Sequence, residues 1–421
     1  MLQAGSSLRQ DPPNSSARKL LQFVPGGSAG GGTSNGTGGI GTGTTYFPTS
    51  IFWGLNPNGT EPHLETICKT PVDTVIVGFV TSYGASRPIK VSLVGHDGAQ
   101  TAADIRTCKA QGIKVLLSLG GPVPTGHGEP CPYGFSSDSP ADYIDGKNAS
   151  AAVAQQRRDV TEVANTIYDC FFTNGTNCSL PASANPFGLN TTFNGYDLSP
   201  NCVSNAGDPA AYSLFAQVLA QRAGAGEAAG GRYTGSLRST ATVSADYPDA
   251  ILGPLPASSG TQGLLGNPAS AQFFSRVNLK YFGTDICDYA SGNITTCYTP
   301  WANWAKIPLP AGTTSPVASA FDRAAPVKPK ISVLIPASPT APGATIWDFI
   351  PTGQLKNVLT PVSTLVNGVF AGVTLWNAAS DNTNEDYAAA IRAALQPTVG
   401  SATGASTSAT GAVANQPARS G

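Results

Sequence analysis

The chain has 421 residues, and its 24 basic side chains are balanced by 25 acidic ones to a net charge of −1. No basic run is present, so neither nucleic acid nor an anionic membrane surface is expected as a partner. No apolar run approaches the ~20 residues that a membrane span requires.

The two ends differ in composition from the middle. Residues 1–45 and 398–421 consist largely of Gly, Ser, Thr, Ala, Asn and Pro. Such segments cannot bury enough apolar area to offset the entropy of ordering, so we predict that both are disordered. Residues 46–397 then form one domain. No hydrophobic leader segment precedes Leu20-Leu21, so we expect that a leader was removed or that the sequence starts late.

Eight short apolar segments recur along this domain, most of them followed by a stretch rich in helix formers. Such alternation predicts a parallel sheet, and eight strands predict its closure into a single-domain α/β (β/α)₈ TIM barrel. The open doubly wound sheet is the alternative, weakened because no glycine-rich phosphate loop follows a strand. The predicted strands are Thr49–Phe52, Thr74–Val80, Lys114–Leu119, Phe193–Leu198, Leu237–Val243, Arg276–Tyr281, Lys330–Ile335 and Gly372–Trp376.

The helix-compatible stretches between these strands are Ala102–Ala110, Ala151–Phe172, Ala210–Ala223, Ala269–Phe274 and Asn384–Leu395. Long insertions are expected over Pro122–Ser150, Asn174–Leu189, Pro254–Pro268 and Pro308–Pro329. Those that follow a strand would surround the carboxyl end of the barrel, where sites are built on this fold.

Eight cysteines and only three histidines, His63, His96 and His127, are present, and no Cys-x-x-Cys pair occurs. This composition predicts disulfides in an oxidising compartment and no metal site. We expect His96 and His127 to be solvated loop residues. Asn-x-Ser/Thr acceptors point to a secreted glycoprotein. They begin at Asn14, Asn35, Asn58, Asn148, Asn174, Asn177, Asn190 and Asn293.

Several segments together resemble the plant class III, hevamine-like chitinases of glycoside hydrolase family 18. Gly112–Gly121, which ends in Ser-Leu-Gly-Gly, is similar to the family's third strand, and Ile51–Asn56 resembles its first. Trp301-Ala302-Asn303-Trp304 resembles the helix before the seventh strand, and Gly372–Trp376 resembles the eighth strand. The resemblance covers residues 49–396 and implies the same barrel.

The resemblance also implies a disulfide between Cys68 and Cys108, since the family has a bridge between its first two helices. A family cysteine is replaced by Ala245, so its usual partner Cys287 is free to pair with the nearby Cys297. Cys170–Cys178 and Cys131–Cys202 complete our predicted set.

The fourth strand of this family carries Asp-Gly-x-Asp-x-Asp-x-Glu, in which the Glu is the general acid and the preceding Asp orients the substrate's acetamido group. The aligned segment here is Asn194–Asn201. Asp197 is retained, Ser199 stands in the position of the orienting Asp, and Asn201 in that of the acid. An amide has no titratable proton near neutral pH, and general acid–base catalysis supplies typically ~10²–10⁴-fold. The resemblance therefore predicts that no catalytic residue is intact.

Two further positions match the family's sugar cleft: Tyr281 falls on the tyrosine that binds the N-acetyl carbonyl, and Trp376 on the tryptophan at the cleft floor. Asp197, Tyr281 and Trp376 are thus the candidate substrate-binding residues, although strand-end aromatics are often only structural. For Asp197 the alternative is a buried carboxylate bonded to Tyr281 or Ser199. Trp53 and Trp301 are expected in the core.

Three functions follow as hypotheses for a secreted, extracellular or cell-wall monomer without a cofactor. The first is non-hydrolytic binding of chitin or a related cell-wall glycan. The second is an active endo-chitinase with an acid relocated to Asp246, Asp285 or Asp381. The third is a structural or protein-interaction role, of the kind found in cereal xylanase inhibitors, with an extracellular protein as the partner.

Overall fold

The computed structural model describes residues 47–55, 59–84, 87–122, 132, 134–135, 151–202, 208–228, 237–255, 263–284, 286–310, 328–384 and 386–396. The chain divides into a unit Met1–Thr44 and a unit Thr45–Gly421, and all described residues belong to the second. Both of the predicted disordered ends, together with most of Pro122–Ser150 and Pro308–Pro329, lie outside these ranges.

Eight parallel strands close into a barrel, because β1 pairs with β2 on one side and with β9 on the other. All eight predicted strands are confirmed, with ends shifted by up to two residues. The strands are β1 (Thr49–Trp53), β2 (Thr74–Ser82), β4 (Lys114–Gly121), β5 (Gly195–Pro200), β6 (Arg238–Ser244), β7 (Arg276–Lys280), β8 (Lys330–Pro336) and β9 (Phe370–Trp376).

A further short strand, β3 (Lys90–Val91), pairs antiparallel with the end of β2. It extends the sheet outside the barrel and was not predicted, because two residues carry no periodic signal. The β2–β4 ladder shifts register between Val77 and Val80. That shift brings Phe79 onto the inner surface of the barrel, beside Phe52 and Trp376.

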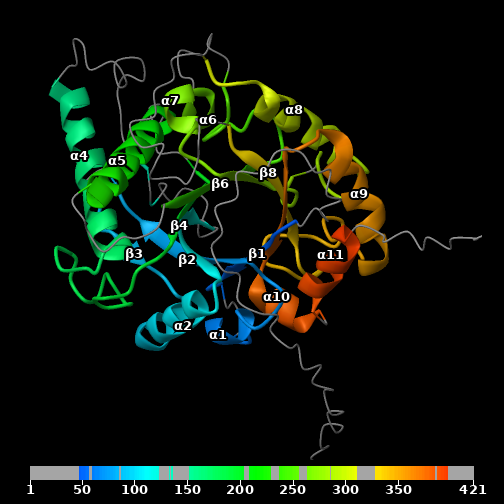
Figure 1. Ribbon diagram of the computed structural model, residues 1–421, viewed down its shortest axis with the longest axis horizontal. Helices are drawn as coiled ribbons and strands as arrows, with labels where there is room; N and C mark the ends of the chain where they lie inside the picture. The colour runs from blue at the N-terminus through cyan, green and yellow to red at the C-terminus, as the bar shows by residue number, and fades with distance from the viewer. Residues whose placement is uncertain are drawn as a thin grey trace, which may run out of the picture. The chain divides into compact units, whose positions relative to one another are not determined.

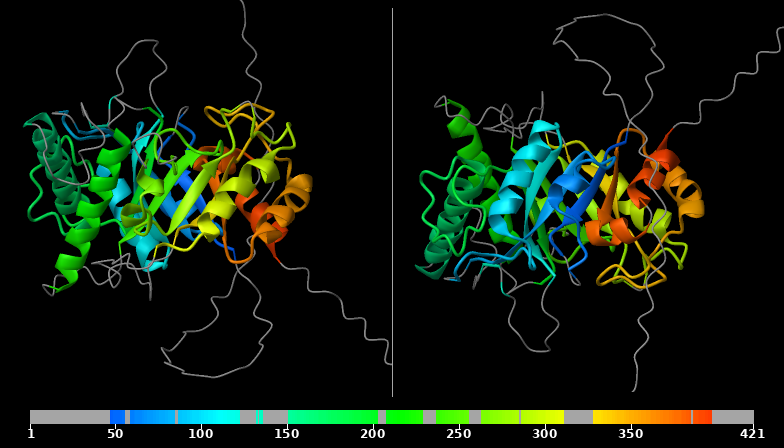
Figure 2. Two further views of the ribbon diagram at one scale, coloured as in Figure 1. Left: turned by 90° about the horizontal axis from the view of Figure 1, so that it is seen from above. Right: turned by 90° about the horizontal axis from the view of Figure 1, so that it is seen from below.

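Helices surround the strands as an outer ring (Figure 1), and the strands run through the middle of the unit when it is seen from the side (Figure 2). The five predicted helical stretches are confirmed as α2, α4, α5, α7 and α11, and α8 contains the Trp301–Trp304 helix that the resemblance implied, while α1, α6, α9 and α10 were not predicted. The helices are α1 (Leu64–Ile67), α2 (Gly98–Ala110), α4 (Ala151–Ile167), α5 (Asp208–Ala228), α6 (Gly263–Gly266), α7 (Pro268–Ala271), α8 (Ile294–Lys306), α9 (Leu355–Leu365), α10 (Ala378–Thr383) and α11 (Tyr387–Leu395). No described helix is both long enough and apolar enough to cross a membrane.

Alternation along each strand separates an outer core from the barrel interior. On β2, Val75 and Val77 pack outward into the main core with the helices, whereas Ile76 points inward. Trp53 and Trp301 are fully buried in the outer core, as predicted. Continuous apolar runs on these strands are explained by burial on both faces.

Three of the predicted disulfides are confirmed: Cys68–Cys108, Cys170–Cys178 and Cys287–Cys297. The first joins α1 to α2, and the third fixes the loop after β7 to α8. Cys131 lies outside the described residues, so the Cys131–Cys202 pairing stays a prediction.

Candidate functional site at the carboxyl end of the barrel

Asp197 lies at the centre of a polar network inside the barrel. Its carboxylate accepts hydrogen bonds from the hydroxyls of Ser118 at 3.0 Å, Thr240 at 2.6 Å and Thr242 at 3.0 Å. The amide of Asn278 adds a longer contact of 3.4 Å. The network spans β4 to β7, so Asp197 ties four strands together.

Burial raises the pKa of the Asp197 carboxyl to about 6, against the lowering effect of the hydroxyl donors and of Arg276. Arg276 is also buried, and its pKa falls to about 10 because burial disfavours its charge. We expected Tyr281 or Ser199 as alternative partners of Asp197, but its carboxylate bonds to Ser118, Thr240, Thr242 and Asn278. The buried structural carboxylate is therefore present, with different partners.

Ser199, near the end of β5, and Asn201, directly after the strand, follow Asp197 toward the carboxyl end of the barrel. Ser199 is buried, and its neighbour across the β4–β5 ladder is Gly120. The Asn201 amide donates to the Gly121 carbonyl at 2.9 Å, and Lys280 Nζ donates to Asn201 Oδ1 at 3.3 Å. The side chain at the expected acid position is thus held between β4 and β7.

Lys280 ends β7 and brings a positive charge to this end of the barrel. Burial lowers the pKa of its ammonium group, while the nearby Asp249 and Asp246 raise it. Asp249 accepts hydrogen bonds from the backbone N–H groups of Ser244, Ile251 and Leu252, so it organises its own turn.

Aromatic rings pack around Trp376 at the carboxyl end of the barrel interior, which we call the barrel mouth. The Trp376 ring lies 5.0 Å from Phe52, 5.5 Å from Phe282 and 6.1 Å from Phe79. Its indole N–H donates to the Pro342 carbonyl at 2.7 Å, and the residue is only 6% exposed. Trp376 is therefore almost fully covered, by these three phenylalanines and by the loop that carries Pro342.

The structure does not bring Tyr281 together with Asp197 and Trp376. Tyr281 lies on the outer face of β7, where its hydroxyl donates to the Ile294 carbonyl at 3.3 Å. Burial raises its pKa well above the ordinary value. The residues on either side of Tyr281 in the sequence, Lys280 and Phe282, face the barrel mouth instead. Lys280 Nζ lies 5.8 Å from the centre of the Phe282 ring.

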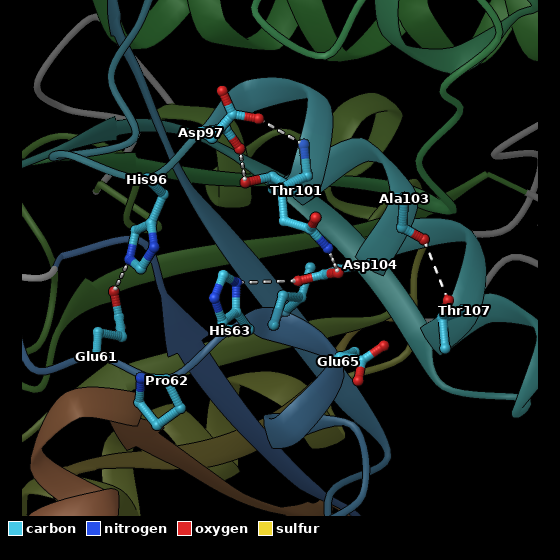
Figure 3. Close-up of polar contacts among 12 residues, drawn as sticks. Glu61, Pro62, His63, Glu65, His96, Asp97, Thr101, Ala103, Asp104 and Thr107 are labelled. Carbon is cyan, nitrogen blue, oxygen red and sulfur yellow. Dashed lines mark hydrogen bonds and ion pairs between the residues drawn. The ribbon is translucent and has the colours of Figure 1, made fainter.

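A buried acid–base pair at the end of β1 was missed from the sequence. His96 Nε2 lies 3.0 Å from Glu61 Oε2, and the same oxygen accepts the Gly54 N–H at 2.9 Å. The His96 ring also packs against the Trp53 ring at a tilt, with the two ring centres 4.2 Å apart. Figure 3 shows Glu61 and His96 facing each other from separate loops. The expectation that His96 is solvated was wrong, because its side chain is only 10% exposed.

The neighbouring pair in Figure 3 is looser: His63 Nδ1 lies 3.9 Å from Asp104 Oδ2, and the His63 side chain is largely exposed. The third histidine, His127, lies outside the described residues.

The three carboxylates considered as relocated acids differ in setting. Asp246 follows β6 and is partly exposed, with Oδ2 3.2 Å from the Ser244 hydroxyl. Asp381 is buried, accepts the Ala388 N–H at 2.8 Å and so holds α10 to α11, and burial raises its pKa to about 6. Asp285 lies outside the described residues. Of the two carboxylates that the structure describes, Asp381 is buried, so only Asp246 is exposed enough to contact a ligand.

Asp246 also lies beside Cys287 and Cys297, and these three groups are close enough to suggest a metal site. The two sulfurs are joined in a disulfide. They cannot act as thiolate ligands, so this trio does not fit a metal ion.

The glycosylation candidates within the described residues fall into two groups. Asn174, Asn177 and Asn190 are exposed in the segment after the Tyr168–Phe172 turn. The Asn293 amide is engaged, since it donates to the Ile286 carbonyl at 3.1 Å. Asn14, Asn35, Asn58 and Asn148 lie outside the described residues.

No family model matches the chain. Among known proteins, an acidic endochitinase of Arabidopsis thaliana is 23% identical over 353 residues, covering 82% of this chain and 89% of the relative. The solved ICChI chitinase of Ipomoea carnea matches 82% of this chain and 99% of its own, with 22% identity and a TM-score of 0.56. These comparisons show a chitinase-like (β/α)₈ barrel that is similar in sequence to plant acidic endochitinases.

Relatives of this chitinase-like barrel include both enzymes and an inhibitor. Chitinase 2 of Rhizopus oligosporus is 24% identical over 343 residues, which are 78% of this chain but 48% of that protein. The chain thus spans about half of that relative's length. The xylanase and alpha-amylase inhibitor XAIP-II of Scadoxus multiflorus matches 82% of this chain and 98% of its own, with 21% identity and a TM-score of 0.56.

Proposed function

We propose that this chitinase-like barrel is a secreted protein that binds chitin or a related cell-wall glycan without hydrolysing it. The observation that carries the proposal is the Asn201 side chain at the expected acid position. Its amide is bonded to the Gly121 carbonyl and to Lys280, and it has no proton to give at neutral pH.

The charge beside Asn201 supports the same conclusion. Lys280 Nζ contacts the amide oxygen at 3.3 Å, and the nearby Asp249 and Asp246 favour its protonated form. A general acid needs a neutral carboxyl that is ready to lose a proton, and a nearby ammonium favours the ionised form instead. This environment is therefore unsuited to the acid step even where a carboxylate is supplied.

Hydrolysis with a relocated acid is the second candidate, and Asp246 is the observation that favours it. Asp246 is partly exposed at the carboxyl end of β6 and close enough to Lys280 to raise the pKa of its ammonium group. This candidate predicts that the wild type cleaves a chromogenic chitotrioside and that Asp246→Asn abolishes cleavage. The proposed binder cleaves it in neither form.

A titration of the purified protein with chitohexaose, followed by calorimetry, tests the binding. We expect saturable binding with a Kd below 1 mM, which corresponds to at least about 4 kcal/mol. Absence of binding to chitohexaose and to insoluble chitin at millimolar sugar would contradict the proposal. Saturable capture of a xylanase by the same preparation would then favour the inhibitor role.

A further inference from the structure

Trp347 differs from every other tryptophan in the chain. It is 64% exposed, whereas Trp53, Trp301, Trp304 and Trp376 are at most 6% exposed. Its neighbour Ile346 is 66% exposed. Tryptophan is enriched at interaction surfaces because its ring combines a large apolar face with a polar N–H group.

A hydrogen-bonded turn holds Trp347 in its exposed position. The buried Asp348 carboxylate accepts from the Thr345 N–H at 2.6 Å and from its hydroxyl at 3.0 Å, while Asp348 N–H donates back to the Thr345 carbonyl at 3.1 Å. Ile346 and Trp347 occupy the two central positions of this turn. The closed turn therefore presents both side chains outward.

A second loop fixes the same segment from the side. The Ala290 N–H donates to the Trp347 carbonyl at 2.9 Å, which joins the loop after β8 to the loop after β7. The loop after β7 is itself fixed to α8 by Cys287–Cys297 and carries another exposed apolar residue, Ile286, at 64%. The indole is thus held on two pre-organised loops.

The loop that carries Trp347 also covers Trp376 in the barrel mouth. Its Pro342 carbonyl accepts the Trp376 indole N–H, and Ala341 and Ala344 pack on the Trp376 cluster. Both loops follow barrel strands, so they lie at the carboxyl end. Trp347 and the largely covered Trp376 therefore belong to the same end of the barrel.

From this arrangement we infer that Trp347 is a stacking subsite for a neutral sugar ring of the bound glycan. The inference rests on the proposed glycan-binding function and identifies the side chain that makes the contact. Trp376 is covered by three phenylalanine rings, whereas Trp347 is free to meet the apolar face of a pyranose. Residues 344–347 carry no charged side chain, which suits an uncharged ligand.

The size of the surface favours a sugar over a protein. A tryptophan buries at most roughly 250 Å², while a stable protein interface needs about 800 Å² from each partner. Apart from Ile346 in the same turn and Ile286 on the adjoining loop, the large apolar side chains that are exposed in the described part of the chain, among them Leu189 and Ile307, belong to other segments. A patch of this extent matches one or two sugar rings.

The test compares chitohexaose binding by the wild type, Trp347→Ala, Trp347→Phe and the control Ile307→Ala, whose side chain is 58% exposed at the far end of α8. We expect a Kd about 10-fold weaker for W347A, less than about threefold weaker for W347F and unchanged for I307A, because an aromatic ring is what the stacking requires. Equal unfolding midpoints exclude a folding defect.

Iodide quenching gives a second readout, since Trp347 is the one tryptophan that iodide can reach. Chitohexaose should protect the wild-type fluorescence and leave W347F fluorescence unaffected. If W347A binds chitohexaose within twofold of the wild type and no protection is seen, the subsite is wrong while glycan binding stands. If the wild type itself does not bind, both proposals fail.

Discussion

Lys280 Nζ lies 3.3 Å from Asn201 Oδ1 and so reaches the position at which the family's general acid is expected. An ammonium group this close keeps an introduced carboxyl ionised. We therefore expect that restoring the family motif alone is insufficient to make this barrel an acid catalyst.

We predict that Ser199→Asp with Asn201→Glu leaves the hydrolysis of a chromogenic chitotrioside undetectable. Adding Lys280→Met removes the cation and should raise the rate at least about 10-fold, within the ~10²–10⁴-fold that general acids supply. The control is K280M alone, which should stay inactive. Equal activity in the double and triple variants, or none in either, would contradict this account of Lys280.

Asp197 should make stability depend on pH. Its folded pKa of about 6 exceeds the ordinary value of 3.8 because of burial. A raised pKa favours the folded state most strongly below the unfolded value, and this contribution is lost as pH rises through about 6. Between pH 7 and pH 5 the wild type should gain about 1 kcal/mol relative to Asp197→Asn. Urea unfolding at both pH values measures this gain, and identical pH profiles would count against it.

The Glu61 carboxylate should be a stabilising group of the loop after β1. Glu61→Ala leaves the buried Gly54 N–H without its acceptor and opens a cavity, so we expect a loss of about 2–4 kcal/mol in unfolding free energy. Glu61→Gln keeps an acceptor oxygen and should cost less than about 1 kcal/mol. Chemical denaturation separates the two variants, and a similar loss in both would mean that charge rather than hydrogen bonding matters.

The disulfides should differ in their effect according to the loop that each closes. Cys68–Cys108 spans 40 residues and Cys170–Cys178 spans 8. The chain-entropy estimate is about 4 kcal/mol for the first and about 2.5 kcal/mol for the second. Paired Cys→Ala variants compared by urea unfolding check the order. A larger loss for the short loop would contradict the entropic explanation.

The strands were predictable because each is a compact apolar run bounded by polar or turn-forming residues, as at Val75–Val77 and Val115–Leu117. Helix α9 was not predictable, because Pro361 lies inside it and proline normally interrupts the interior of a helix. The Glu61–His96 pair was not predictable either, because its members are 35 residues apart and neither belongs to a motif.

The candidate site shows both the use and the limit of a family resemblance. Alternation along β5 correctly placed Asp197 in the barrel interior. On β7 the same rule puts Asn278 and Lys280 inward and Tyr281 outward, whereas the family match had suggested Tyr281 for the cleft. A shift of one residue along a strand reverses the face, so resemblance alone could not decide which side chain meets a ligand.

The central claim is that the barrel holds a chitin oligosaccharide and leaves it intact. The most direct test incubates the protein with saturating chitohexaose for a day and analyses the sugar by mass spectrometry, with bound and free sugar separated first. We predict chitohexaose in the bound fraction and no shorter oligosaccharides. Accumulation of chitobiose, chitotriose or chitotetraose, lost in Asp246→Asn, would contradict the claim.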